Sequence, residues 1–508
     1  MSQKTVFTRD KEFDKKYILF LFAVSALLMT FGSMTSFLFP MHVGVDQNCF
    51  FTIGKSVLDG KVLYKDIYDQ KGPLLFFIHT FAALISSKNM YGVYLLQIIN
   101  FTVILYYVGK IRGLYLGDKY RYLVPAATGL IIVTTFCYSR GDNAEEFIMT
   151  FYMIAIYHIM RYLKSGEEVI SSKVMFVNGI LAASILWIKY TMLGFYIAWC
   201  LIVGITVFYR KNFLAAFRAA MLFLSGMFVA TIPYILYAVV TDSMGDFLWA
   251  YFYTNISLYS THVSFMRRIE IFFTQDILWN PVMMPTVLLG LIYFCRSKEM
   301  LENKWHKFSL VLMAVCTYVF VFIGGTRYKY YLLIFASFTV FGVIFWVKLF
   351  EKQIEKLNQH RTRTIAIAVV IYIVSIIGFS NCAPYYFKSA DYYPQARIAK
   401  IIKEENATVL NYNFLDCGVY LMSESPLPPT RFFCRQNIPR TVFPEMFDAQ
   451  ENLIREKAVD YVLVRFGRNR PLSDFAECPE LFTNYTLVDD SYWEPVDDYR
   501  FALFKVNK

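Results

Sequence analysis

Carboxylates in two separate stretches are the side chains best suited to acid–base chemistry. Asp46 follows the first long apolar run almost directly, and Asp142, Glu145 and Glu146 lie between two later apolar runs. A carboxylate at such a boundary with water can accept a proton from an incoming hydroxyl when a neighbouring cation or a low dielectric adjusts its pKa. We therefore predict that Asp46 is a general base and that Glu145 or its neighbour Glu146 is a second catalytic carboxylate.

Structural roles remain open as alternatives for both stretches. The alternative for Asp46 is a solvated carboxylate, or a cap for the amphipathic stretch that follows, and position alone favours that alternative. The alternative for the second stretch is a polar turn, with Gly141-Asp142-Asn143 as turn residues and the two glutamates at a helix N-terminus.

Further charged side chains near these carboxylates are predicted to bind the substrate. Lys189 interrupts the apolar stretch 174–209, and two more cations lie in the run Gly-Gly-Thr-Arg-Tyr-Lys-Tyr-Tyr. Lys and Arg at headgroup level suit a phosphate or diphosphate, whereas snorkelling or pairing with loop carboxylates is the alternative. The predicted substrate-binding residues are Asp66, Asp69, Lys71, Asp142, Lys189, Arg267, Arg268, Arg327 and Lys329.

The composition decides what kind of protein must position these residues. Of the 508 residues, 57% are hydrophobic and 18% are charged, against roughly 45–50% and 25% in typical globular domains. A mean hydropathy of +0.42 leaves too little polar surface to cover an ordinary soluble enzyme. The same numbers exclude a disordered chain, and a polytopic helical membrane protein remains.

Runs of about 20 mostly apolar residues mark candidate transmembrane helices, and packed helices can be shorter. The sequence predicts eleven spans, at 17–40, 91–108, 122–138, 146–160, 174–188, 193–209, 216–240, 281–295, 308–323, 331–347 and 364–381. Residues 73–87 are apolar but short, and counting them as a span would reverse the charge bias of the loops. We therefore expect an interfacial or re-entrant helix there, within an outer loop that covers residues 41–90.

The distribution of basic residues predicts the orientation. More than twice as many Lys and Arg fall in the expected inner segments as in the expected outer loops, so the N-terminus is expected inside a plasma (cytoplasmic) membrane. An odd number of spans then places residues 382–508 outside. That segment is polar, with β-rich runs at 407–412 and 461–465 and a helical pattern at 448–457. We predict a membrane domain over 1–381 and a small extracytoplasmic α/β domain over 382–508.

The cysteines suggest no zinc site. Nine are present, and five of them, Cys49, Cys382, Cys417, Cys434 and Cys478, are expected outside. At most two disulfides can form among five cysteines. A pair such as Cys417 with Cys434 is one possibility, but the sequence does not assign it.

The stretch Val45-Asp46, followed by Gly60-Lys-Val-Leu-Tyr-Lys-Asp66-Ile-Tyr-Asp69-Gln-Lys71-Gly-Pro-Leu-Leu, resembles a known family. It is similar to the GT-C superfamily of membrane glycosyltransferases, particularly bacterial relatives of protein O-mannosyltransferases and lipid A aminoarabinose transferases. The layout of residues 17–347 resembles the same superfamily. Two departures are visible. Gln47 follows Asp46 where protein O-mannosyltransferases have an Asp-Glu pair, and Lys71-Gly-Pro replaces the commoner Pro-Pro form.

The resemblance implies transfer of a sugar from a polyprenyl-phosphate donor on the outer face of the membrane, for modification of a cell-envelope glycan or lipid. By position, Asp46 resembles the family's catalytic base and Glu145 or Glu146 its second acidic residue. Lys189 resembles the basic residue near the outer turn after the fourth span. Arg327 and Lys329 are similar in placement to basic residues near the lipid phosphate.

The reaction expected is a single displacement at the anomeric carbon. Asp46 removes the acceptor proton, and fixed cations stabilise the charge that develops on the leaving phosphate. This logic requires no metal or cofactor, although the superfamily also contains metal-dependent branches. The expected partners are the lipid-linked donor, a glycan, lipid or protein acceptor, and membrane lipid, without nucleic acid. The alternatives are a transporter or flippase for a lipid-linked sugar, or a non-catalytic membrane scaffold.

Overall fold

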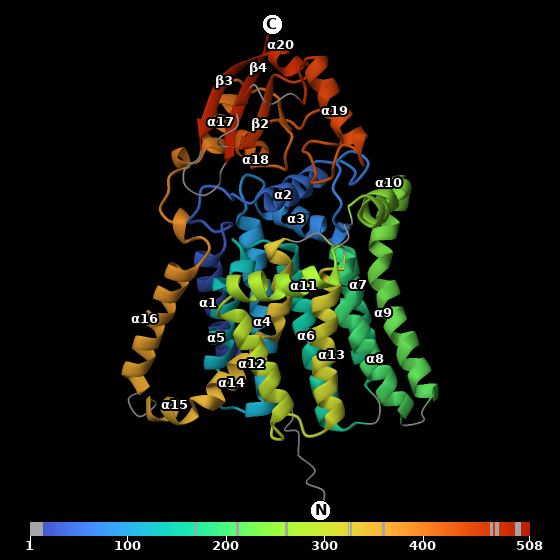
Figure 1. The fold of residues 1–508 in the computed structure, drawn as a ribbon, viewed down its shortest axis with the longest axis vertical. Coiled ribbons are helices and arrows are strands. Elements are labelled where there is room, and N and C mark those ends of the chain that lie inside the picture. The colour runs from blue at the N-terminus through green and yellow to red at the C-terminus, as the bar shows by residue number, and fades with distance from the viewer. Residues whose placement is uncertain are drawn as a thin grey trace, which may run out of the picture.

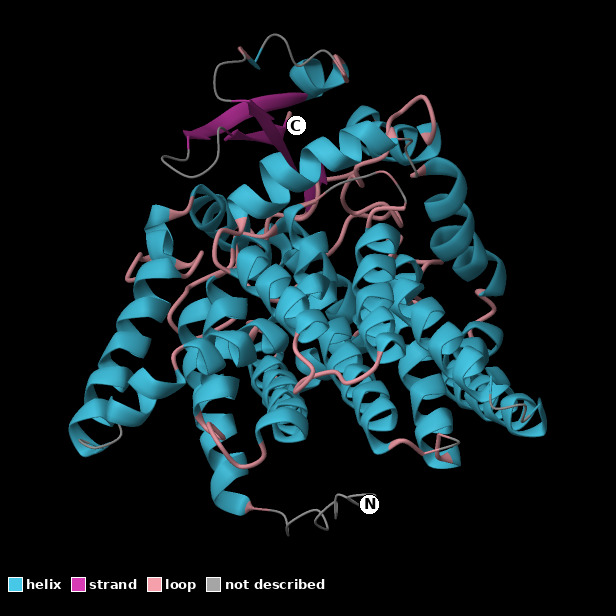
Figure 2. Ribbon diagram, turned by 60° about the horizontal axis from the view of Figure 1, so that its bottom comes forward, coloured by secondary structure: helices cyan, strands magenta, loops and turns pink. Residues whose placement is uncertain are grey.

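The computed structural model describes residues 14–167, 170–209, 213–259, 263–323, 325, 328–357, 361–467, 471–472, 477–492 and 499–507. Helices that run alongside one another form a bundle, and a small sheet lies at one end of it (Figure 1). The end of the bundle next to this sheet is called the sheet end below. The strands drawn in Figure 2 are confined to the C-terminal part of the chain. The predicted fold class, a helical membrane protein with a small C-terminal sheet, is confirmed.

Every range predicted to span the membrane contains a helix. These helices are α1 (Lys15–Gly32), α4 (Tyr91–Leu116), α5 (Leu123–Thr134), α6 (Ala144–Ser165), α7 (Ser172–Lys189), α8 (Gly194–Tyr209), α9 (Phe213–Val240), α12 (Met283–Arg296), α13 (Lys304–Val321), α14 (Thr339–Leu349) and α16 (Arg361–Phe379).

Length and composition identify a smaller set of helices as candidate spans. Within the described ranges, 6 helical segments are long and apolar enough to cross a membrane, and three shorter apolar helices accompany them. The protein is therefore a multi-pass membrane protein. The count of eleven spans stays a prediction, because α6 and α13 fall outside both groups.

Two helices of the segment 41–90 lie across the sheet end rather than along the bundle. They are α2 (Val45–Leu58) and α3 (Pro73–Ile85), and Figure 1 shows them between the bundle and the sheet. Pro73 begins α3, where its missing N–H is not needed. Gly54 lets the two helices approach closely, because a Cβ at Gly54 would lie 2.6 Å from the backbone of His79. This packing sets the position of the N-terminus of α2, where Asp46 lies.

Shorter elements complete the membrane part. They are η1 (Phe136–Tyr138), η2 (Tyr190–Leu193), α10 (Met244–Leu248), η3 (Trp249–Leu258), α11 (Phe265–Ile271), η4 (Phe272–Ile277), η5 (Lys329–Phe338) and α15 (Glu351–Leu357). The 3-10 helix η5 precedes α14 directly, and its residues from Tyr331 onward are buried. It therefore brings Tyr331 into the interior at the sheet end and leaves Lys329 and Tyr330 half-buried.

The C-terminal part combines helices with a four-stranded sheet of order β1-β2-β4-β3. Its elements are η7 (Ala383–Tyr385), η8 (Ala390–Tyr392), α17 (Pro394–Glu404), β1 (Val409–Tyr412), α18 (Val419–Ser423), α19 (Pro444–Arg455), β2 (Tyr461–Gly467), α20 (Glu480–Asn484), β3 (Tyr485–Tyr492) and β4 (Tyr499–Val506). Strands β1 and β2 are parallel and the other neighbours are antiparallel. The two predicted β-rich runs and the predicted helix correspond to β1, β2 and α19.

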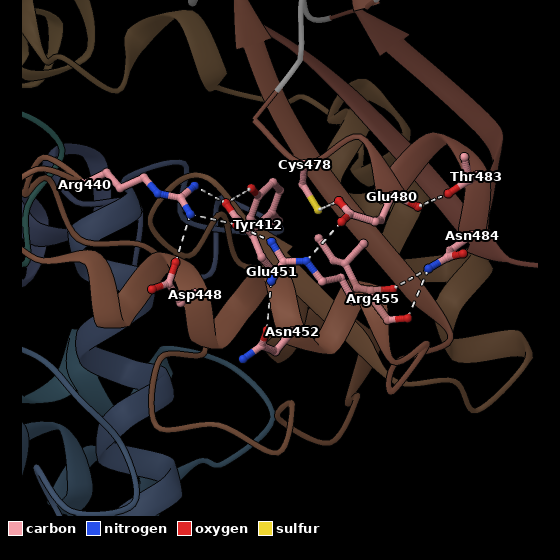
Figure 3. A network of polar contacts seen from close by, with 11 residues as sticks. Tyr412, Arg440, Asp448, Glu451, Asn452, Arg455, Cys478, Glu480, Thr483 and Asn484 are labelled. Carbon is pink, nitrogen blue, oxygen red and sulfur yellow. Dashed lines mark hydrogen bonds and ion pairs between the residues drawn. The ribbon is translucent and has the colours of Figure 1, made fainter.

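A buried carboxylate ties α19 to the sheet. Glu451 is 1% exposed, and it accepts hydrogen bonds from the Tyr412 hydroxyl at 3.1 Å, from Arg440 at 2.6 Å and from Arg455 at 3.2 Å. Arg455 extends the network to Glu480 of α20 (Figure 3). Because each group in this network already has partners, we interpret it as a structural tie.

The C-terminal part also contacts α2. The Thr52 hydroxyl donates to Asp416 Oδ2 at 2.6 Å, and the backbone N–H of Gly418 donates to Asp416 Oδ1 at 2.8 Å. The Sγ atoms of Cys49 and Cys434 lie 3.6 Å apart. All nine cysteines are free, and the close neighbour of Cys434 is Cys49 of the outer loop.

We expect Gly54→Ala to destabilise the protein by about 1–3 kcal/mol, because the added Cβ would overpack α2 against α3. Gly204→Ala is the matched control, since a Cβ there would meet no described atom within 4 Å. Thermal unfolding of both variants in one detergent measures the difference. Equal unfolding temperatures would contradict the close packing.

Asp416 predicts a specific dependence of stability on pH. Burial raises the pKa of its carboxyl from 3.8 to about 6. The hydrogen bonds from Thr52 and Gly418 act to lower this pKa, but burial outweighs them. Between these two pH values the folded chain holds a proton that the unfolded chain has lost, so this group's contribution to stability falls as pH rises from 4 to 6. The loss is on the order of 3 kcal/mol, at about 1.4 kcal/mol per pKa unit.

Asp416→Asn cannot ionise, and we expect it to gain stability relative to the wild type as pH rises through this window. The exposed Asp391 supplies the control variant Asp391→Asn. Unfolding temperatures measured at pH 4 and pH 7 for all three proteins test this. A constant difference between Asp416→Asn and the wild type would contradict it.

Candidate functional site

Asp46 lies at a cavity between the bundle and the C-terminal sheet. The residue is in the first turn of α2, and its Oδ2 accepts a hydrogen bond of 2.6 Å from the Tyr330 hydroxyl of η5. The cavity has a volume of about 230 Å³ and is called the Asp46 cavity. Its lining residues are Val43, Gly44, Val45, Asp46, Gln47, Ser139, Arg140, Lys329, Tyr330, Gln395, Cys417, Arg465, Tyr499 and Phe501.

A second cavity collects two of the predicted cations. Lys71 and Lys189 both line this space of about 260 Å³, together with aromatic residues that include Tyr251, Tyr259 and Tyr331. We call it the lysine cavity. Lysines that face one enclosed space can both contact an anion placed there.

Lys189 is held by a buried ion pair. Its Nζ lies 2.8 Å from Glu145 Oε1, and the Glu145 side chain is only 1% exposed. Lys189 Nζ also lies 3.2 Å from the centroid of the Tyr331 ring, a cation–π contact. The other carboxylate oxygen of Glu145, Oε2, is buried without a hydrogen-bond partner among the described residues. Glu145 therefore positions Lys189 and keeps one acceptor atom unused.

Lys71 experiences the negative charges of two carboxylates, Asp69 and Asp46. Asp69 is 1% exposed, and it accepts hydrogen bonds from the Lys71 backbone N–H at 2.8 Å and from the Gln436 amide at 3.0 Å. Burial raises the pKa of the Asp69 carboxyl. Burial acts to lower the pKa of Lys71, but the negative charges of Asp69 and Asp46 outweigh burial and raise it above its ordinary value. Lys71 therefore stays positively charged at neutral pH.

Adjacent residues of η5 each line one of the two cavities, Tyr330 the Asp46 cavity and Tyr331 the lysine cavity. Tyr330 contacts Asp46 and Tyr331 contacts Lys189. Asp46 and Lys189 thus line different cavities, separated by neighbouring tyrosines. The structure brings Asp46 and the Glu145–Lys189 pair to the same end of the bundle without placing them in one shared cavity.

Asp142 and Glu146 lie in a buried network beneath these cavities. Glu146 Oε2 accepts 2.9 Å hydrogen bonds from the Gln97 amide and from the backbone N–H of Asp142. His79 Nε2 lies 3.1 Å from Asp142 Oδ1, and His79 Nδ1 lies 2.8 Å from the Leu75 carbonyl. A carbonyl only accepts, so Nδ1 carries a proton and a further proton is shared between Nε2 and Asp142. This network fixes α3 against the N-terminus of α6.

The remaining predicted residues have different surroundings. Lys329 lines the Asp46 cavity, and its Nζ lies 4.7 Å from the centroid of the Phe136 ring. Asp66 is exposed and accepts a hydrogen bond of 2.8 Å from the Val62 N–H. Arg267 pairs with Glu270 on an exposed face of α11. Arg327 lies outside the described residues.

Arg268 lies at a long apolar groove between α11, η4, α12 and α13. The groove has a volume of about 970 Å³ and is lined mainly by Phe, Leu, Ile and Val side chains. Arg268 donates a hydrogen bond to the Phe322 carbonyl. Ile323 lines both this apolar groove and the lysine cavity, so the two spaces adjoin.

Sequence reasoning missed several residues of these cavities and of their surroundings, among them Arg140, Gln395 and Arg465 of the Asp46 cavity. Tyr330 and Tyr331 stand directly beside Lys329, and their aromatic run was the available signal. Gln436, the partner of Asp69, is 367 residues away along the chain, and no local pattern marks it. Among the described residues, no group of three His, Cys, Asp or Glu side chains is arranged to hold a metal ion.

Comparison with solved structures identifies the fold. The structure of ArnT from Cupriavidus metallidurans bound to undecaprenyl phosphate matches with a TM-score of 0.62 and 13% identity, over 96% of this chain and 98% of ArnT. The apo structure of the same protein matches with a TM-score of 0.55 and 12% identity, over 96% and 97%. No protein-family model and no curated protein matches the sequence. The chain thus has the fold of ArnT.

Breaking the buried ion pair should reduce stability strongly. We expect Lys189→Met to cost about 3–5 kcal/mol, because it leaves the Glu145 carboxylate buried without its partner. The double variant Lys189→Met with Glu145→Gln should recover much of this loss. The control is Lys119→Met, whose side chain is 63% exposed in its pair with Glu351 and should cost about 0–1 kcal/mol. The unfolding temperatures of the wild type and the variants test this prediction. Equal losses of stability in Lys189→Met and Lys119→Met would contradict the buried pair.

Proposed function

We propose that this protein is a membrane glycosyltransferase that moves a sugar from a polyprenyl-phosphate donor to an acceptor hydroxyl at the sheet end, on the outer face of the membrane. The observation that carries the proposal is that two spaces of different character are neighbours. The apolar groove adjoins the lysine cavity at Ile323. One ligand could therefore place its apolar chain in the groove and its anionic head group in the lysine cavity.

The apolar groove suits the polyprenyl chain. Its volume of about 970 Å³ lies at the upper end of the range of roughly 300–1,000 Å³ that is usual for small-molecule pockets. Arg268 adds a positive charge beside it. Undecaprenyl phosphate is bound by ArnT, which shares this fold at 13% identity. That likeness supports a ligand of the same class here.

The lysine cavity suits the phosphate. When the bond from the anomeric carbon to the phosphate oxygen breaks, negative charge grows on that oxygen. Lys71 and Lys189 face the cavity. Glu145 pairs with the Lys189 ammonium, and Asp69 accepts a hydrogen bond from the Lys71 backbone N–H. Cations fixed in advance stabilise this charge without reorganisation at the moment of reaction.

Asp46 is proposed as the base on the acceptor side. Tyr330 donates its hydrogen bond to Oδ2 of the carboxylate, and Oδ1 can then accept the hydroxyl proton of the acceptor. The acceptor oxygen attacks the anomeric carbon, and the phosphate leaves with the bonding electrons. The tyrosines of η5 separate the two cavities in this structure, so a change in their side-chain positions is expected when donor and acceptor bind.

The proposal predicts separate effects on chemistry and on binding. We expect Asp46→Asn to reduce transfer by about 10²–10⁴-fold, the usual contribution of a general base, while binding of undecaprenyl phosphate stays unchanged. Lys71→Gln should weaken that binding. Transfer is measured with a radiolabelled polyprenyl-phosphate sugar and membrane glycolipid acceptors.

Asp59→Asn is the control on the same segment, because Asp59 lies at the C-cap of α2 and its side chain makes an exposed pair with Lys55. We expect it to transfer like the wild type. Full transfer by Asp46→Asn would remove Asp46 from the role of base. Unchanged lipid binding by Lys71→Gln would remove the lysine cavity from the donor site.

A further inference from the structure

Two cysteine thiols meet where α2 contacts the C-terminal part. The Sγ atoms of Cys49 and Cys434 lie 3.6 Å apart, which is direct contact between heavy atoms, and both side chains are buried. The other cysteines expected outside each donate a hydrogen bond to an oxygen atom instead, and they are Cys382, Cys417 and Cys478. Cys49 and Cys434 are therefore the two best placed to form a disulfide.

Hydrogen bonds next to each sulfur hold the two segments in place. The backbone N–H of Asp416 donates to Cys49 Sγ at 3.3 Å. On the other side, the Gln436 amide, two residues after Cys434, donates to Asp69 at 3.0 Å. These contacts keep the thiols opposite each other without a covalent bond. A small approach of the two sulfur atoms is then enough to bring them to bonding distance.

The orientation in the proposed function places both thiols outside the cytoplasm, where disulfides form and persist. Burial raises the pKa of both thiols, and the thiolate is the form that takes part in disulfide exchange. Exchange is therefore slow once the C-terminal part has packed on α2. A disulfide made before that packing is complete stays protected from reductants afterwards.

We propose that Cys49 and Cys434 form a disulfide in the mature protein, a covalent link between the helix that carries Asp46 and the C-terminal part. The proposal rests on the outer-face location in the proposed function. The oxidant is an extracytoplasmic dithiol–disulfide oxidoreductase. One cysteine thiolate attacks the disulfide of the oxidant, and the second displaces the oxidant from the mixed disulfide. One S–S bond forms here while one breaks in the oxidant, whose two thiols receive both protons and both electrons.

The disulfide would link segments that carry residues of both cavities. Cys49 follows Asp46 by three residues on α2, and residues three apart are neighbours on a helix surface. Gln436, the partner of Asp69, follows Cys434 by two residues. The bond joins positions that are 385 residues apart, so it restricts the unfolded chain strongly. It therefore stabilises the packing of the C-terminal part on α2.

Disulfide mapping in the full-length protein tests the proposal. Membranes are solubilised in N-ethylmaleimide to block free thiols, and the purified protein is digested without reduction for mass spectrometry. We expect a linked peptide pair that joins Cys49 to Cys434. Blocked thiols at both positions would overturn the proposal, as would a link between Cys417 and Cys434.

A reductant should lower the unfolding temperature of the wild type by about 5 °C. Cys49→Ser and Cys434→Ser should each remove this response. Cys478→Ser is the matched control, because Cys478 bonds to Glu480 within the C-terminal part, and it should keep both the linked peptides and the response. A reductant response that persists in Cys49→Ser and Cys434→Ser would contradict a stabilising link. Failure of the proposed function would instead appear as full transfer by Asp46→Asn, whatever the state of the two cysteines.

Discussion

A positive charge buried among apolar helices must be paired, and the ion pair between Lys189 and Glu145 meets this requirement at the sheet end. The pair joins the C-terminus of α7 to the N-terminus of α6, where the helix dipoles favour these signs of charge. Tyr331 packs over Lys189 and so fixes η5. Tyr330, the next residue, reaches Asp46. One buried contact thus determines where the cations, the tyrosines and the carboxylate lie.

The same constraint explains why the site is built from parts that are distant in sequence. A lipid-facing bundle cannot hold several charges on its outside, so the charges gather where the bundle ends and other elements cover them. Helices α2 and α3 lie across that end, and the C-terminal part contributes Gln436, Arg465 and Gln395. Because α2, α3 and the C-terminal part exclude water from this end of the bundle, the dielectric is low around charges that water would otherwise screen.

Two of the predicted substrate residues illustrate the limits of reasoning from a motif. Asp66 belongs to the same recognised stretch as Asp69 and Lys71, yet it closes an exposed turn through the Val62 N–H. Arg267 and Arg268 are neighbours, but successive residues on a helix point about 100° apart. Arg268 therefore faces the apolar groove while Arg267 pairs with Glu270 in solvent.

The sequence by itself determined the helical membrane class, the positions of the long apolar helices, two of the four C-terminal strands and the GT-C resemblance, because apolar runs and strand patterns are local properties of the chain. It also marked Asp46, Lys71 and Lys189 as exceptional, because charges next to apolar runs are rare. Only the tertiary structure decided which of these charges share a cavity, that Glu145 pairs with Lys189, and that Arg465 lines the same cavity as Asp46. Those contacts depend on helix crossings and on a domain hundreds of residues away, and no local pattern encodes the distance between such groups.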